Sequence, residues 1–122
     1  MKTVLSIVFF VLALNCYSQK IEIPDKNFEQ LLVDLKIDSD KKVNGYLLKS
    51  DALLVTSLDI SNSSIRDLTG IESFTSLQYL YCYDTQLTNL NLKENISLIS
   101  LLTNVSNVIY PNETFWKMDW FD

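Results

Sequence analysis

The stretch LQYLYCYDTQL (77–87) places tyrosines at alternate positions of a short apolar segment. Side chains of a β-strand point alternately to opposite faces, so Leu80 and Cys82 share one face. The other face carries Tyr79, Tyr81 and Tyr83. A single strand does not reveal which of its two faces is buried, so the surrounding sequence has to decide.

Two further stretches, VTSLDISNSSI (55–65) and LISLLTNVSNV (98–108), follow the same pattern at spacings of 22 and 21 residues. The alignment makes three sets of residues equivalent: Leu58, Leu80 and Leu101; Ile60, Cys82 and Thr103; and Ile65, Leu87 and Val108. The common frame is L-x-x-L-x-L-x-x-N-x-L, the leucine-rich repeat pattern, whose leucine positions point into the core. The frame therefore buries Leu80 and Cys82 and leaves the tyrosines on the open face.

Each frame predicts one short strand, and neighbouring strands are expected to lie parallel about 4.8 Å apart. The residues expected to line the return path of each coil are Leu68, Gly70, Ile71, Phe74, Leu90, Leu92 and Ile96. The asparagine position of the frame holds Ser63, Thr85 and Ser106. A hydroxyl offers one donor where an amide offers two, so looser turns are expected after the strands. One coil cannot bury its own apolar face, so both ends of the stack need caps.

The stretch LTGIESFTSLQYL (68–80) resembles the L-x-G-I-E-x-L-x-x-L-x-x-L signature of internalin-type leucine-rich repeat proteins. IEIPDKNFEQLLVDLKIDSD (21–40) and NLNLKENISL (89–98) resemble secreted leucine-rich repeat proteins of flavobacteria. The resemblance covers residues 21–110 and implies an α/β solenoid, a short right-handed leucine-rich repeat coil with an N-terminal cap helix, parallel strands and an aromatic C-terminal lid. Members of this family are mostly surface or secreted binding modules, so the resemblance implies binding without catalysis.

The N-terminal cap is predicted as an amphipathic helix. Its apolar stripe at i, i+3, i+4 and i+7 comprises Phe28, Leu31, Leu32 and Leu35. Asp25 is the expected N-cap residue, and Glu29 is expected in the first turn on the polar face. That polar face lacks the basic stripe of a membrane-surface helix, so the stripe is expected to cover the first coil.

Residues 1–18 have the layout of a secretory signal peptide, because Lys2 precedes an apolar run too short to span a membrane. Cleavage is expected near Ser18 or Gln19, with a lipoprotein anchored at Cys16 as the alternative. The protein is thus expected to be secreted or at the cell surface, without membrane insertion after cleavage. The remaining boundaries are 19–54 for the helical cap, 55–110 for the repeats and 111–122 for a C-terminal cap or tail.

The C-terminal segment leaves the repeat pattern and is rich in large apolar side chains. They are Tyr110, Phe115, Trp116, Met118, Trp120 and Phe121. An aromatic lid over the last coil is the preferred interpretation; an exposed aromatic ligand site and a disordered or truncated tail are the alternatives.

The composition argues against an enzyme. The chain has no histidine, the usual general base and commonest metal ligand, and only two glycines, so it has no phosphate-binding glycine loop. No cofactor is expected. The net charge of −5 without a basic cluster argues against nucleic acid as a partner. If the signal is removed, Cys82 has no disulfide partner and is expected to be a small core residue.

The segment Asp38–Gly45 has some features of a calcium loop. An EF-hand loop starting at Asp38 needs ligands at its positions 5 and 12, where this chain has Lys42 and Lys49. An acidic connecting turn is therefore the preferred interpretation.

The open sheet face is the candidate binding surface. In register with the three tyrosines are Ser57, Asp59 and Ser61 on one side and Ser100, Leu102 and Asn104 on the other. The candidate ligand-binding residues are Tyr79, Tyr81, Tyr83, Asp59, Leu102 and Asn104. Tyrosine provides large contact area and a polar tip, which suits recognition of a protein or glycan at the cell surface. The alternative is a minimal or degenerate repeat remnant with no ligand, in which the rings only stabilise the short sheet. The oligomeric state stays open.

Overall fold

The computed structural model describes residues 19–112. Residues 1–18 and 113–122 lie outside this range. The predictions of a signal peptide and of the aromatic side chains from Phe115 to Phe121 fall outside it and stay predictions.

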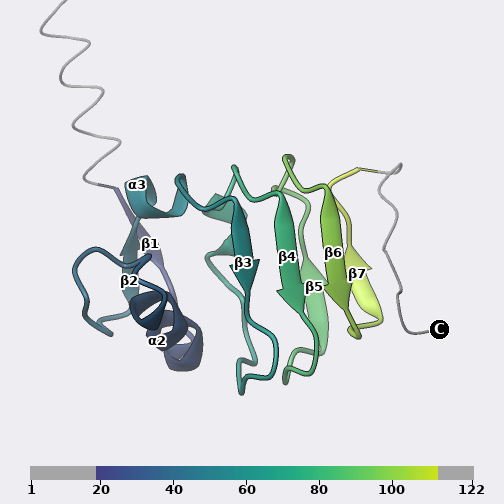
Figure 1. Cartoon of the computed structure of the whole chain (residues 1–122), viewed down its shortest axis with the longest axis horizontal. Coiled ribbons are helices and arrows are strands. Elements are labelled where there is room, and N and C mark those ends of the chain that lie inside the picture. Colours follow the sequence, from purple (N-terminus) through teal and green to yellow (C-terminus); the bar gives the residue numbers. More distant parts are fainter. Residues whose placement is uncertain (1–18, 113–122) are drawn as a thin grey trace, which may run out of the picture.

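The described chain forms a row of turns with a helical cap at its N-terminal end (Figure 1). The elements of the cap are β1 (Lys20–Glu22), α2 (Lys26–Asp34), β2 (Tyr46–Leu48) and α3 (Lys49–Ala52). The repeats contain β3 (Ser57–Asp59), the 3-10 helix η1 (Ile71–Ser73), β4 (Tyr79–Cys82), β5 (Asn89–Asn91), β6 (Ser100–Thr103) and β7 (Asn107–Ile109). The strand pair β1–β2 and the short helix α3 were not predicted from the sequence.

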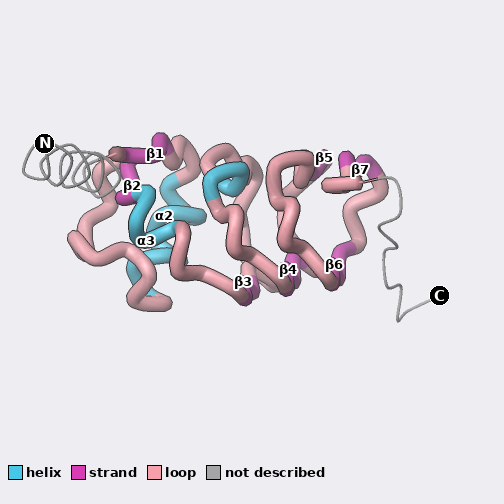
Figure 2. Tube along the Cα trace, turned by 90° about the horizontal axis from the view of Figure 1, so that it is seen from above, coloured by secondary structure: helices cyan, strands magenta, loops and turns pink. Residues whose placement is uncertain are grey.

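The three repeat frames form a parallel sheet in the order β3-β4-β6. The register pairs Leu58 with Leu80 and Leu80 with Leu101, and it pairs Cys82 with Thr103. The sequence alignment of the frames is therefore confirmed within these strands. It is wrong at Val108, which pairs with Leu90 of the preceding coil and not with Leu87, because the third repeat is three residues shorter between its strand and β7. Seen from above, this sheet lines one side of the molecule and the parallel pair β5–β7 lines the other, with loops between them (Figure 2).

The core lies between these two sides. The frame positions of the first two repeats, including Leu58, Leu80 and Cys82, are buried. On the return path the prediction is wrong at Ile96, which is 71% exposed. Its neighbour Asn95 is buried instead, because its side-chain amide donates to two carbonyl groups of the preceding coil, those of Ile71 at 2.8 Å and Phe74 at 3.2 Å.

The helix α2 caps the first coil, as predicted, but with two of the four stripe residues fully buried. Phe28 and Leu32 are inaccessible to solvent, and the ring of Phe28 lies 6.3 Å from that of Phe74 in the first coil. Leu31 is half-buried against the core. The prediction for Leu35 is wrong, since it follows the last helical residue and is 50% exposed.

Glu29 also departs from the prediction of a solvated polar face. Its side chain is buried, and its carboxylate accepts hydrogen bonds from the backbone N–H groups of Gly45 at 2.8 Å and Asn44 at 3.3 Å. A buried carboxylate is tolerated when backbone donors satisfy it. Glu29 thus holds the loop before β2 against the helix.

One carboxylate joins the cap to the repeats. Asp25 is the N-cap of α2, as predicted, because its Oδ1 accepts from the N–H groups of Asn27 and Phe28. Its Oδ2 accepts from the N–H groups of Arg66 and Asp67 in the first coil, at 2.8 and 3.0 Å. Burial pulls the pKa of Asp25 upward, but the four backbone donors outweigh burial and hold this pKa below 3.8.

Gly70 makes a second junction between cap and repeats. Its φ of 108° belongs to the left-handed region that favours glycine, and a Cβ there would lie 2.9 Å from the carbonyl oxygen of Glu22 in β1. The first coil therefore packs directly on the backbone of β1.

Candidate binding face

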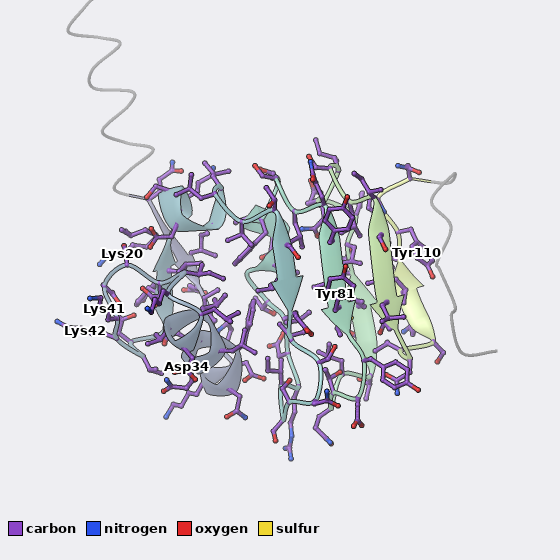
Figure 3. All side chains as sticks on the ribbon, viewed as in Figure 1. Lys20, Asp34, Lys41, Lys42, Tyr81 and Tyr110 are labelled. Atoms are coloured by element: carbon purple, nitrogen blue, oxygen red, sulfur yellow. The ribbon has the colours of Figure 1, made fainter. Side chains whose placement is uncertain are left out.

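The exposed surface of the sheet β3-β4-β6 carries the residues that the sequence predicted for it. This surface, called the tyrosine face below, comprises Ser57, Asp59, Ser61, Tyr79, Tyr81, Tyr83, Ser100, Leu102 and Asn104. Burial alternates along each strand, with Leu58, Leu80 and Leu101 inaccessible and their neighbours open to solvent. The alternation places Tyr81 on the front of the sheet (Figure 3).

The six predicted site residues are brought together by the register of the three strands. Tyr81 in β4 is paired with Asp59 in β3 and with Leu102 in β6. These three residues form a row across the sheet, and parallel strands lie about 4.8 Å apart. Tyr79 and Tyr83 stand before and after the row and are 38% and 37% exposed, while Tyr81 is half-buried.

The end of the tyrosine face is fixed by backbone hydrogen bonds. The N–H of Tyr83 donates to Ser61 Oγ at 3.1 Å, and the carbonyl of Tyr83 accepts from Asn62 N–H at 2.9 Å. Asp59 Oδ1 accepts from Ser61 N–H at 2.9 Å, so its carboxylate lies along the same edge. Ordered backbone at a binding surface lowers the entropy lost when a partner binds.

The turns that follow β3 and β4 share a left-handed residue at the same frame position. Asn62 and Asp84 have φ of 56° and 57°, a conformation for which asparagine and aspartate are favoured among non-glycine residues. The third repeat has Val105 there, a β-branched residue that is buried and whose N–H donates to Thr103 Oγ1 at 3.0 Å. The turn geometry thus changes at the third repeat.

Two of the three residues at the asparagine position, Ser63 and Thr85, make local hydrogen bonds. Ser63 Oγ donates to the carbonyl of Ile60 at 2.7 Å, and Thr85 Oγ1 accepts from Leu87 N–H at 3.3 Å. Both bonds stay within one repeat, so they fix single turns and do not tie neighbouring coils together.

One predicted site residue has a supporting role, and two exposed residues were missed. Asn104 Oδ1 accepts from Asp84 N–H at 3.3 Å, so Asn104 braces the turn after β4.

Asp84 itself is exposed directly after Tyr83, and Ile99 is 61% exposed directly before β6. The period-two pattern ends with the strand, so it gave no signal for either residue.

One cavity lies beside the tyrosine face, and another lies away from it. One of about 450 Å³ lies between the cap and the start of β3 and is lined by Leu35, Lys36, Leu54 and Ser57 among others. Another cavity, of about 370 Å³, is polar and is lined by Asp67, Glu72 and Asn89 among others. Asn89 is the first residue of β5. Neither is lined by any of the six predicted site residues.

Within residues 19–112, no group of three or more histidine, cysteine, aspartate or glutamate side chains is arranged to hold a metal ion. The acidic turn contains a buried carboxyl, because Asp38 is 2% exposed and its Oδ1 accepts from Asp40 N–H at 3.2 Å. Burial, together with the neighbouring Asp40 carboxylate, raises the pKa of Asp38 from 3.8 to about 6. This part of the chain also contains no helix long and apolar enough to cross a membrane.

Comparison with known proteins finds several that are similar to this chain. Internalin J of Listeria monocytogenes serotype 4b (strain F2365) is 35% identical over 72 residues, which are 59% of this chain and 8% of that protein. The functional domain of InlJ from Listeria monocytogenes, described as including a cysteine ladder, matches with a TM-score of 0.66 and 28% identity over 83% of this chain and 24% of that one. The CBM51-2 and INT domains of Clostridium perfringens ZmpB match with a TM-score of 0.55 and 26% identity over 70% of this chain and 17% of that one. No family model matches the chain.

The described part of this chain has one cysteine where a ladder needs several. Cys82 is flanked in the stack by Ile60 and Thr103, the equivalent residues of the neighbouring repeats. Cys82 is therefore a buried core residue, as predicted from the frame.

Proposed function

We propose that this chain, whose leucine-rich repeats are of the internalin type, is a non-catalytic binding module. It recognises a protein or glycan through the tyrosine face. The observation that supports this most directly is the presence of Tyr79, Tyr81 and Tyr83 along one strand, on the open surface of an ordered sheet. Aromatic side chains with polar tips are enriched at recognition surfaces because they bury large area at a small cost in side-chain entropy.

The proposal includes the setting of the module. Residues 1–18 act as a secretory signal peptide, so the module works in the secreted form or at the cell surface, and Cys16 leaves with the signal. The cap at 19–54 and the repeats at 55–110 form a short right-handed stack. The segment 111–122 closes its far end as an aromatic lid. The 72 matched residues span 8% of the length of internalin J.

Retention on cell envelopes tests the proposal. The purified secreted chain is incubated with envelopes of the producing cells and with immobilised host glycans, and bound protein is measured for wild type and for Tyr81→Ala. We expect Tyr81→Ala to lose retention while it keeps most of its thermal stability. The matched control is Tyr46→Ala, because Tyr46 is 44% exposed on β2 in the cap, away from the tyrosine face.

The remnant without a ligand predicts the opposite pair of results. In that case Tyr81→Ala lowers the melting temperature, and neither variant changes retention. Equal loss of retention in Tyr46→Ala and Tyr81→Ala would also contradict the proposal, because the site would then not lie on the tyrosine face.

A further inference from the structure

We infer that the tyrosine face binds a basic segment of another protein, with a lysine or arginine side chain lying across the row formed by Asp59, Tyr81 and Leu102. This inference rests on the proposed function and names the chemistry of its ligand. It follows from the order of the three side chains in the row and from the charge of the surface around them.

The row changes from charged to apolar across three strands. Asp59 in β3 is exposed, the ring of Tyr81 in β4 is half-buried beside it, and Leu102 in β6 is half-buried beyond the ring. A lysine or arginine side chain has the same order of properties, because an aliphatic stem carries a charged head. The stem fits against Leu102 and the tyrosine ring, and the head then meets the carboxylate.

The carboxylate at the end of the row has capacity for a cation. Within residues 19–112, the Asp59 carboxylate accepts one hydrogen bond, from Ser61 N–H to Oδ1, and has no ion pair with a basic side chain. The ring of Tyr81 is a second partner, since a cation above an aromatic face is attracted by its negative π surface. A basic head at this point therefore meets two favourable groups.

The charge of the surrounding surface has one sign. The strands β3, β4 and β6 and the residues that directly follow them contain two charged side chains, Asp59 and Asp84, and both are acidic. Lys20, Lys41 and Lys42 lie at the far end of the molecule, in the cap (Figure 3). The cavity beside the start of β3 is lined by one lysine, Lys36, and also by Asp51.

These features favour a basic peptide over a neutral glycan. A neutral glycan stacks on aromatic rings and donates hydroxyl hydrogen bonds to carboxylates, whereas a basic segment also gains charge attraction from Asp59 and Asp84. The face is also an exposed sheet surface, which suits an extended chain whose side chains lie across the strands.

Calorimetric titration with a defined probe tests the inference. The probe is a blocked peptide in which lysine alternates with serine, and its control is the same peptide with every lysine ε-acetylated. We expect the lysine peptide to bind wild type and the acetylated peptide to bind far more weakly. We expect Asp59→Asn to weaken binding of the lysine peptide about 1.4- to fivefold, the range of one exposed charge pair. Asparagine keeps the Oδ1 acceptor for Ser61 N–H, so the variant is expected to fold.

The charge-matched control is Glu22→Gln. It also removes one exposed carboxylate but lies on β1 in the cap, so binding is expected to stay at the wild-type level. Equal weakening by Glu22→Gln and Asp59→Asn would overturn the inference, because the peptide would then sense only the net charge of −5. Equal binding of the acetylated peptide would overturn it as well, and so would binding of a neutral oligosaccharide but not of the lysine peptide.

The retention assay separates this inference from the proposed function. If Tyr81→Ala abolishes retention on envelopes and Asp59→Asn leaves retention unchanged, the tyrosine face is a binding site but its ligand is not basic. If Tyr81→Ala leaves retention unchanged, the proposed function itself fails. If Tyr81→Ala abolishes retention, Asp59→Asn weakens it and Glu22→Gln leaves it unchanged, both statements are supported.

Discussion

Replacing Asp25 by asparagine separates the two tasks of its carboxylate. Oδ1 caps α2 through hydrogen bonds from Asn27 N–H at 2.9 Å and Phe28 N–H at 3.1 Å. Oδ2 accepts from Arg66 N–H and Asp67 N–H in the first coil. Asparagine caps helices as well as aspartate, but its amide group presents hydrogens where Oδ2 accepted two bonds. Asp25→Asn therefore keeps the cap and removes the junction.

The size of the effect follows from the two lost bonds. A hydrogen bond to a charged group contributes about 1.5–3 kcal/mol to stability, and water partly replaces these two because Arg66 and Asp67 are exposed. We expect Asp25→Asn to lower the free energy of unfolding by about 2 kcal/mol. Loss of an N-cap typically costs ~1 kcal/mol, so Asp25→Ala should lower it by about 3 kcal/mol. In a domain of this size 1 kcal/mol shifts the melting temperature by about 4–8 °C, so the asparagine variant should melt about 8–16 °C lower.

Thermal and denaturant unfolding measure both changes, with Asp34→Asn as the control. Asp34 is an exposed aspartate at the end of α2, and its Oδ1 accepts from Gln30 Nε2, a bond that asparagine preserves. The control is expected to unfold like wild type. A melting temperature of Asp25→Asn equal to that of wild type would refute the reasoning, because the bonds to the first coil would then add nothing. Equal stabilities of Asp25→Asn and Asp25→Ala would refute the contribution assigned to the cap.

The pH dependence of Asp25 gives a second check on the same carboxylate. Its pKa is below 3.8 in the folded chain, so the unfolded chain binds the proton more readily. Its contribution is therefore fully present above pH 3.8 and is lost as the pH falls through the folded pKa. Asp25→Asn should lack this acid-dependent loss while it retains the losses caused by other carboxylates.

Three further predictions concern the buried groups. Because burial raises the pKa of Asp38 to about 6, wild type should become more stable as the pH falls from 7 toward 5, and Asp38→Asn should remove this gain; a flat wild-type curve over that range contradicts the buried charge. Leu32→Ala should cost ~2–5 kcal/mol because Leu32 is fully buried, whereas Leu35→Ala should change stability by less than ~0.5 kcal/mol; chemical denaturation of the pair would expose an error if both behave alike. Cys82 is inaccessible, so a thiol reagent monitored by mass should label it only after unfolding, and rapid labelling of the native chain would mean that the repeat register is wrong.

The repeat frame was predictable because the same pattern of apolar residues occurs three times in the sequence. Leucine positions that align in the sequence also align across the strands, so Leu58, Leu80 and Leu101 occupy one layer of the core. The alternation within each strand then fixes which side chains face solvent. The geometry of the tyrosine face was therefore within reach of the sequence, while its ligand stays a prediction.

The departures occur where distant backbone groups satisfy a polar side chain. Glu29 was expected in solvent because helix periodicity treats every glutamate as polar surface. Its carboxylate instead accepts hydrogen bonds from Gly45 N–H and Asn44 N–H. Asn95 is buried in place of Ile96 for the same reason, since its amide donates to carbonyl groups of the preceding coil. Their partners lie between 15 and 24 residues away in the chain, beyond any local pattern.

The sheet formed by β5 and β7 could not be predicted from a local sequence pattern, for another reason. The strand β5 comprises Asn89, Leu90 and Asn91, so its alternation covers only three residues and one apolar side chain. It forms only because β7 lies beside it in the next coil, with Leu90 paired to Val108. Such a strand is a product of the stack, and its existence follows from the packing of the repeats.

The stability of a Tyr81 variant can show whether the tyrosines serve recognition or only stabilise the sheet. The largest single contributions expected are those of buried leucines and of Asp25 at the junction between cap and repeats. Cross-strand side-chain pairs on an exposed sheet face contribute only about 0.2–1 kcal/mol each. Tyr81 is half-buried, so its removal should leave most of the stability in place if its main role is recognition. A larger loss would mean that the ring fills a packing role in the sheet, and the remnant without a ligand would then become the better account of this surface.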